Sequence, residues 1–123
     1  MNVLNTDQCA ESLISRANKV LPAGSFGNMP GDIVLERGKA GRVWDINGTE
    51  YVDFLLGSGP MFVGHAHPDV TKAITGQAPQ GTTFFANNQY GIKLAEEICE
   101  AMTCADQLRF VSSGSEATLY AMR

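Results

Sequence analysis

The sequence predicts an α/β fold that is incomplete within this chain. Apolar residues recur at helical spacing in three segments, and turn residues separate three strand-like runs. A further apolar run, residues 107–111, leads through a Gly-Ser turn into a helix, which is how an α/β unit begins. Because one such strand cannot form a parallel sheet, we expect its neighbours to lie beyond Arg123.

The composition is that of a soluble globular protein rather than a disordered or fibrous one. The 9 basic and 13 acidic residues give a net charge of −4, and no basic cluster favours a nucleic-acid partner. No apolar run reaches the ~20 residues that a membrane-spanning helix requires. Cys9, Cys99 and Cys104 match no zinc or redox spacing and suit a reducing cytosol, so we expect a cytoplasmic protein.

The first predicted helix covers residues 9–21, because its apolar residues fall near helical spacing and Pro22 ends it. The loop that follows is rich in glycine and proline. Its residues 25–28, beginning with Ser25, either line a functional site or form a plain connection, and the pattern favours neither interpretation.

Residues 33–54 predict an antiparallel meander with strands over residues 33–37, 42–46 and 49–54. The second and third strands flank Asn47-Gly48, a pair that favours a type I′ turn with positive φ at both positions. We expect the packing residues of the meander to be Trp44, Ile46, Tyr51 and Val52.

Glycines, a proline and helical spacing predict the remaining elements. Gly57, Gly59 and Gly64 mark a stretch where the backbone approaches a neighbour closely. Pro68 suits the first turn of a helix over residues 69–77. Further helices are expected over residues 92–102 and from the Gly-Ser turn to Arg123, with the strand 107–111 between them.

Residues 112–116, SSGSE, are predicted to bind an anion. A helix N-terminus exposes unpaired N–H groups and the positive end of the helix dipole. Gly114 lets the backbone approach a ligand, and Ser113 and Ser115 offer hydroxyl groups, so the stretch favours a phosphate. The alternative is an ordinary capping box, because Ser113 and Glu116 have the S-x-x-E spacing, which needs no ligand.

The histidines and the acidic residues of the meander are assigned no chemistry. His65 and His67 lack the further ligands that a metal site needs, and neither has an evident acidic partner that would make it a base. Alternation along the strands places Asp45, Glu50 and Asp53 on a solvated edge.

Five stretches follow one another through nearly all of the chain after residue 12: LPAG, ERGKAGRVWDINGTEYVDF, GSGPMFVGHAHPDV, KLAEEI and LRFVSSGSEATLYAMR. Taken together and in this order, they resemble the N-terminal portion of a class III aminotransferase, a pyridoxal-phosphate enzyme of fold type I. The likeness is greatest to the glutamate-1-semialdehyde aminomutase branch. The expected fold is therefore the N-terminal part of a pyridoxal-phosphate-dependent transferase.

The resemblance implies that the protein binds pyridoxal 5′-phosphate and that its phosphate is held by Ser113, Gly114 and Ser115. It implies four positions that border the substrate: Ser25, Gly57, Ser58 and Gly59. It also assigns residues 1–69 to a small N-terminal domain and residues 70–123 to the beginning of the large cofactor domain.

The resemblance places the Schiff-base lysine outside this chain, since no matching position is occupied by Lys19, Lys39, Lys72 or Lys93. We therefore expect no catalytic residue here, and a homodimeric parent enzyme that acts on a small-molecule amino donor and acceptor. The aminomutase branch carries an arginine in the loop after the first helix, and its absence here favours a transaminase of other specificity. The alternative is a non-catalytic chain that binds a phosphorylated ligand or a partner subunit.

Overall fold

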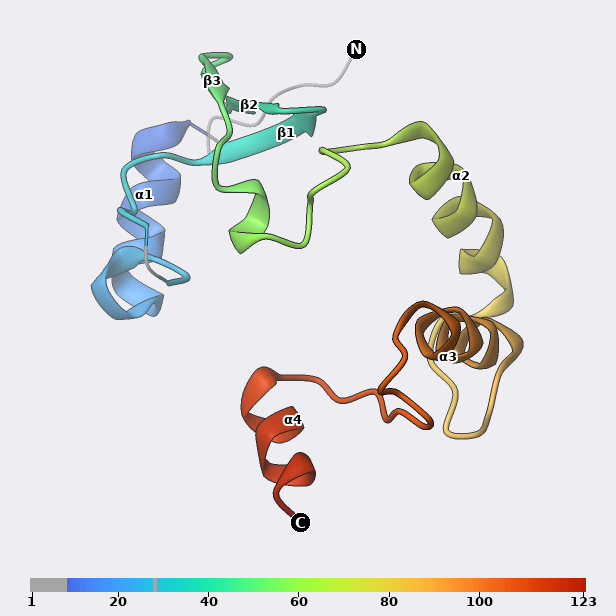
Figure 1. Ribbon diagram of the computed structural model, residues 1–123. Helices are drawn as coiled ribbons and strands as arrows, with labels where there is room; N and C mark the ends of the chain where they lie inside the picture. Colours follow the sequence, from blue (N-terminus) through green and yellow to red (C-terminus); the bar gives the residue numbers. More distant parts are fainter. Residues whose placement is uncertain (1–8, 28) are drawn as a thin grey trace. The chain divides into compact units, whose positions relative to one another are not determined.

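The computed structural model describes residues 9–27 and 29–123 (Figure 1). The chain divides into two compact units, which adjoin in the sequence between Pro79 and Gln80. The first contains α1 (Ala10–Val20), a sheet and α2 (Pro68–Gln77), and the second contains α3 (Gln89–Ala101) and α4 (Gly114–Ala121).

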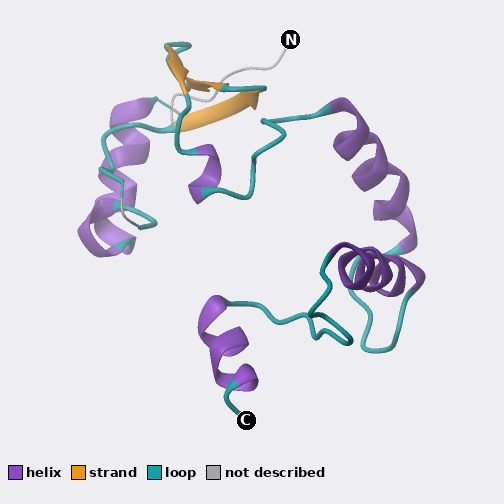
Figure 2. Ribbon diagram, in the orientation of Figure 1, coloured by secondary structure: helices purple, strands orange, loops and turns teal. Residues whose placement is uncertain are grey.

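The sheet of the first unit is a three-stranded antiparallel meander in the order β1-β2-β3, as predicted (Figure 2). Its strands are β1 (Leu35–Lys39), β2 (Arg42–Asp45) and β3 (Glu50–Val52). β1 lies two residues later than predicted and extends into the expected turn. Lys39 pairs with Arg42, so Ala40 and Gly41 form the connection, and Ala40 takes a φ of 50° there.

The turn between β2 and β3 differs from the predicted type I′ turn. Gly48 has a φ of 84°, whereas Asn47 is not among the described residues with positive φ. The N–H of Gly48 donates to the carbonyl of Asp45 at 2.9 Å, which closes a turn that begins at Asp45. Asp45 Oδ1 also accepts the N–H groups of Asn47 and Thr49, and this anchor favours a longer turn with one left-handed glycine.

The core of the sheet lies at β2, the central strand. Among the described residues, the hydrophobic side chain that is buried is Val43, which is 7% exposed. It was not among the predicted packing residues of the meander. The predicted packing residues Trp44, Ile46 and Tyr51 are half-buried. Val52 is 53% exposed, so its prediction is wrong. Successive strand residues face opposite sides, and Val52 faces away from the side on which Tyr51 packs.

The helices form where they were predicted, with shifted ends. Pro68 is the first residue of α2, where its missing N–H costs nothing. α3 begins about one turn earlier than predicted, because Asn88 Oδ1 accepts the N–H of Gly91 at 2.9 Å and caps the helix. α4 ends at Ala121, two residues before the predicted end.

Residues 107–111, predicted as a strand, form no strand in the described part of the chain. A strand needs a hydrogen-bonded neighbour, and none of the described residues supplies one to this segment. The predicted α/β unit is therefore represented by its Gly-Ser turn and its helix alone.

The helices α2, α3 and α4 bury no residue. Ile74 on α2 is 62% exposed, Ile92 on α3 is 49% exposed and Leu119 on α4 is 52% exposed. Amphipathic helices of folded proteins pack their apolar side against other elements. These three helices thus expose apolar surface of the kind that normally packs against another element.

Candidate functional site

The N-terminus of α4 presents unpaired hydrogen-bond donors. Ser113 is the N-cap residue, and its Oγ accepts the N–H of Glu116 at 3.2 Å. Gly114 and Ser115 are the first two helical residues, and their N–H groups donate no hydrogen bond within the described residues. The structure thus brings Ser113, Gly114 and Ser115 together at one helix end, and we call them the α4 cradle.

Glu116 forms a cap at the same helix end. Its Oε2 accepts the N–H of Ser112 at 2.8 Å and the hydroxyl of Ser113 at 3.3 Å. The S-x-x-E spacing therefore does form a cap, although the carboxylate accepts the backbone N–H of the residue before the N-cap and, from the N-cap residue itself, only the hydroxyl. The cap and an anion site are compatible, because the cap engages the N–H groups of Ser112 and Glu116 and leaves those of Gly114 and Ser115 available.

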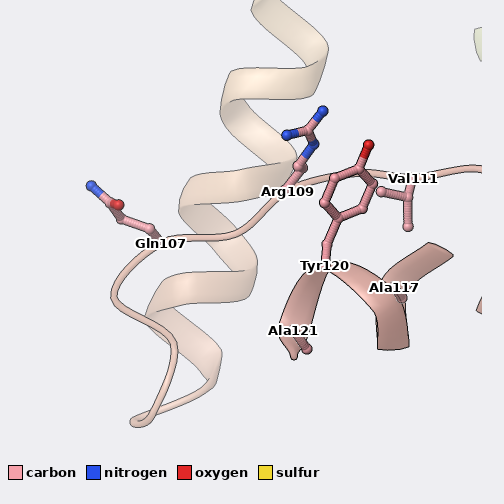
Figure 3. A pocket seen from close by; sticks show the side chains of 6 residues that line it. All are labelled: Gln107, Arg109, Val111, Ala117, Tyr120 and Ala121. Carbon is pink, nitrogen blue, oxygen red and sulfur yellow. The ribbon is translucent and has the colours of Figure 1, made fainter. Parts of the chain in front are cut away.

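A pocket of about 430 Å³ lies beside α4 (Figure 3). Its lining comprises Gln107, Arg109, Val111, Ala117, Tyr120 and Ala121. The guanidinium carbon of Arg109 lies 4.3 Å from the centre of the Tyr120 ring, which is a cation–π contact. This contact ties the segment before α4 to the helix. Sequence reasoning missed it, because Arg109 lies outside the helix and a periodic pattern relates residues within one element.

The first unit contains a groove of about 1080 Å³ bounded by α1, the loop after it and the segment after β3. The structure brings three of the four predicted substrate-bordering residues to this groove: Ser25, Gly57 and Ser58. Gly59 is not part of its lining, and Asn28 lies outside the described residues. The lining is mostly apolar, with contributions from Leu13, Val20, Leu21, Phe26, Ile33 and Leu55.

Asp53 and His65 form a pair that the sequence did not predict. Nε2 of His65 lies 2.6 Å from Oδ2 of Asp53, and their side chains are 22% and 13% exposed. The predictions that His65 lacks an acidic partner and that Asp53 lies on a solvated edge are therefore wrong. The chain returns to the sheet after β3, where the backbone of His65 bonds to Ala40, and this brings the two side chains together.

The hydrogen bonds to Asp53 favour its ionised form. The bond from His65 is the largest influence, and it lowers the pKa of Asp53 below its usual value. The N–H groups of Leu56 and Leu55 act in the same direction, and the partial burial of the carboxyl opposes them.

Asp45 was also predicted on a solvated edge, and this is wrong because it is 7% exposed. Burial raises its pKa, but the hydrogen bonds from Thr49, Tyr51 and Asn47 outweigh burial and hold the pKa below its usual value. The Tyr51 hydroxyl donates to Oδ2 at 3.1 Å. Glu50, by contrast, is 45% exposed beside Arg42, and its predicted solvated position is confirmed.

The remaining predicted features form no site in the described residues. Nδ1 of His67, the residue before α2, is buried and has no hydrogen-bond partner among them. Across residues 9–27 and 29–123, no group of three or more His, Cys, Asp or Glu side chains is arranged to hold a metal ion. None of the described helices combines the length and the apolar character needed to cross a membrane.

The family is identified by comparison with known proteins. The family model for aminotransferase class-III matches residues 24–123. This chain therefore belongs to the class III aminotransferase family, as the predicted resemblance implied. A glutamate-1-semialdehyde 2,1-aminomutase of Desulfitobacterium hafniense is 40% identical to it, over 95% of this chain and 29% of that protein.

Solved structures bear out the predicted fold class. An omega-transaminase from Sphaerobacter thermophilus matches 92% of this chain with a TM-score of 0.82 and 32% identity. A transaminase with pyridoxal phosphate bound matches 91% of it, again with a TM-score of 0.82 and 32% identity. This chain spans 27% of each of these two structures, so it has the fold of one part of a pyridoxal-phosphate-dependent transferase.

Proposed function

We propose that these residues form the N-terminal part of a pyridoxal-phosphate-dependent aminotransferase or aminomutase that acts on an amino acid or amino aldehyde. The observation that carries the proposal is the α4 cradle, where the available N–H groups of Gly114 and Ser115 lie beside the hydroxyl of Ser113. The proposal is supported by the membership of this chain in the class III aminotransferase family.

The α4 cradle fits a phosphate group in its chemistry. Phosphate oxygens accept hydrogen bonds from backbone N–H groups and hydroxyls, and the positive end of the helix dipole favours their charge. Apart from the two neighbouring residues and the backbone of α4 itself, no atom lies within 4 Å of the place that a Cβ on Gly114 would occupy, so a ligand can approach the backbone there. Ser113, Gly114 and Ser115 would therefore hold the cofactor by its phosphate.

Pyridoxal phosphate, when bound, supplies an electron sink that stabilises negative charge on the α-carbon of an amino substrate. The residues of this chain bind and orient. The α4 cradle holds the phosphate, while Ser25, Gly57, Ser58 and Gly59 border the substrate. On this proposal, the lysine that receives and returns the proton at the α-carbon belongs to a part of the enzyme outside this chain.

The proposal favours a transaminase over an aminomutase, because residues 24–32 lack the arginine that binds the substrate carboxylate in the aminomutase branch that the chain resembles. The homodimer and the two domains, residues 1–69 and 70–123, stay predictions from the family resemblance, and the cytoplasmic location stays a prediction from the cysteine pattern. Assaying the full-length protein with paired amino donors and acceptors, and separately with glutamate-1-semialdehyde alone, distinguishes the two activities.

The test of the α4 cradle uses the full-length protein that contains this chain. With pyridoxal phosphate, the wild type should acquire a near-visible absorbance band. The double variant Ser113→Ala/Ser115→Ala should raise the Kd for the cofactor roughly 10- to 100-fold, because hydrogen bonds to a charged group are lost. Ser112→Ala is the matched control, because the Ser112 side chain makes no hydrogen bond within the described residues.

Two results would contradict the proposal. One is a folded full-length protein that acquires no absorbance band with the cofactor. The other is a double variant that binds the cofactor as tightly as Ser112→Ala does.

A further inference from the structure

We propose that Asp53 and His65 are positioning residues, which together hold the loop of residues 54–64 so that it forms one wall of the substrate groove. We call the pair the clasp. The inference rests on the proposed function, because it takes the groove of the first unit to be where the substrate binds. It assigns a role to two side chains that the proposed cofactor and substrate contacts do not include.

The two ends of the loop are attached to one turn of the sheet. At the beginning of the loop, the N–H of Asp53 donates to the carbonyl of Gly41 at 2.9 Å. At its end, the N–H of His65 donates to the carbonyl of Ala40 at 2.8 Å, and the N–H of Ala40 donates to the carbonyl of His65 at 2.9 Å. The backbone of the Ala40–Gly41 turn is therefore hydrogen-bonded to both ends of the loop. The contact between the side chains of Asp53 and His65 joins the same two ends.

One carboxylate connects the clasp to the interior of the loop. While Oδ2 of Asp53 contacts His65, Oδ1 accepts the N–H groups of Leu55 at 2.9 Å and Leu56 at 3.0 Å. The backbone of Leu56 and of Ser58 takes a conformation that L-amino acids rarely adopt, with φ of 46° and 65° respectively. Such conformations persist where surrounding contacts impose them, and Asp53 provides such contacts immediately before this turn.

Two glycines allow close packing around His65. A Cβ on Gly38 would lie 2.6 Å from Cγ of His65, and a Cβ on Gly64 would lie 2.9 Å from the backbone of Ala40. The histidine ring thus packs directly against the backbone of β1. The position of the ring, and through it that of Asp53, is set by the sheet.

The clasp acts on the groove through the loop and not by direct contact. Leu55, Gly57 and Ser58 line the groove, whereas Asp53 and His65 do not. Loss of the clasp should therefore weaken substrate binding without touching the reacting atoms. Since neither Asp53 nor His65 belongs to the α4 cradle, cofactor binding should be unaffected.

The experiment compares His65→Ala, His65→Gln and Asp53→Asn with wild type in the full-length protein. Glutamine matters because its amide nitrogen can replace Nε2 as the donor to Asp53. We expect His65→Ala to raise KM on the order of tenfold, with kcat within about twofold and the cofactor band unchanged. His65→Gln should restore most of KM. Asp53→Asn keeps an oxygen that can accept the N–H groups of Leu55 and Leu56, so it should raise KM less than His65→Ala does. Arg42→Ala, which removes the exposed pair with Glu50 in the same sheet, is the control and should behave like wild type.

Hydrogen exchange of the loop amides gives a second readout that needs no activity. His65→Ala should speed exchange in residues 55–59, and His65→Gln should leave it near wild type. An unchanged KM and unchanged exchange in His65→Ala would overturn the inference, as would a His65→Gln variant that rescues neither. A wild type without a cofactor band would instead refute the proposed function, while the exchange comparison would still test the clasp.

Discussion

The carboxylate of Asp53 contacts Nε2 of His65 at 2.6 Å with one oxygen and accepts two backbone N–H groups with the other. The two residues are twelve positions apart in the sequence, so this contact closes a loop. The side chains are 13% and 22% exposed, whereas those of the Arg42–Glu50 pair are 53% and 45% exposed. Because water screens an exposed pair more effectively, the Asp53–His65 pair should contribute more to stability.

The first prediction concerns acid stability. The folded pKa of Asp53 is lower than its usual value of 3.8, so its ionised form stabilises the folded state. This contribution is complete above the unfolded pKa and is lost as the pH falls below 3.8 and through the folded pKa. The difference in Tm between wild type and Asp53→Asn, followed from neutral pH downwards, should therefore shrink in that acid range. A difference that stays constant across it would contradict the assignment.

The second prediction concerns the β2–β3 turn. Asp45→Ala removes the acceptor for the N–H groups of Asn47 and Thr49 and for the Tyr51 hydroxyl, so it should lower Tm the most. Asp45→Asn keeps a carbonyl oxygen for the two N–H groups and should have a smaller effect. Tyr51→Phe removes the hydroxyl bond alone and serves as the comparison. Equal Tm values for Asp45→Ala and Tyr51→Phe would show that the turn does not depend on this anchor.

The third prediction separates backbone strain from loss of space at two glycines. Gly48 has a φ of 84°, whereas Gly41 is not among the described residues with positive φ. At both positions, no atom beyond the two neighbouring residues lies within 4 Å of an added Cβ. Gly48→Ala should therefore cost about 1–2 kcal/mol through strain alone. Gly41→Ala should be neutral or stabilising by up to about 1 kcal/mol. Chemical denaturation of the two full-length variants measures both values, and equal values would contradict the strain argument.

The fourth prediction concerns Glu116, whose carboxylate accepts the N–H of Ser112 at 2.8 Å. Glu116→Ala should loosen the start of α4 and raise the cofactor Kd several-fold in the full-length protein, because the α4 cradle is less well ordered. Glu116→Gln keeps an acceptor oxygen and should bind the cofactor nearly as well as wild type. Equilibrium titration followed by absorbance measures both constants, and equal losses in the two variants would point to the charge of Glu116 instead.

The fifth prediction concerns residues 1–123 expressed alone. The helices α2, α3 and α4 bury no residue, so this polypeptide should lack a sharp cooperative thermal transition. It should also bind a dye that reports exposed apolar surface. Scanning calorimetry of the isolated polypeptide is the measurement, and a single sharp heat-absorption peak would contradict the prediction.

Local signals predicted most of the secondary structure. The helix over residues 69–77 followed from Pro68 and the spacing of its apolar residues, and the meander followed from alternation and turn residues. The strand over residues 107–111 failed because strand formation depends on a neighbour, which the sequence of the segment does not contain. The type I′ turn failed because the side chain of Asp45 selected a longer turn, and a dipeptide pattern takes no account of such an anchor.

The α4 cradle could be predicted because its three residues are consecutive and share one helix end. The clasp could not, because Asp53 and His65 meet only when the chain returns to the Ala40–Gly41 turn. Neither residue follows a periodic pattern with the other. The groove lies between these two cases in how far it could be predicted. The family resemblance indicated Ser25, Gly57 and Ser58, but only the structure shows that they line one groove.

The attachment of residues 54–64 at Ala40 and Gly41 has a consequence for protein engineering. A segment with both ends fixed to the same point of a scaffold can be exchanged as a cassette. Homologous sequences could therefore be transplanted between Asp53 and His65, or lengthened there, without altering the strand register. On the proposed function, libraries confined to this interval would vary the substrates that the full-length protein accepts without changing the α4 cradle.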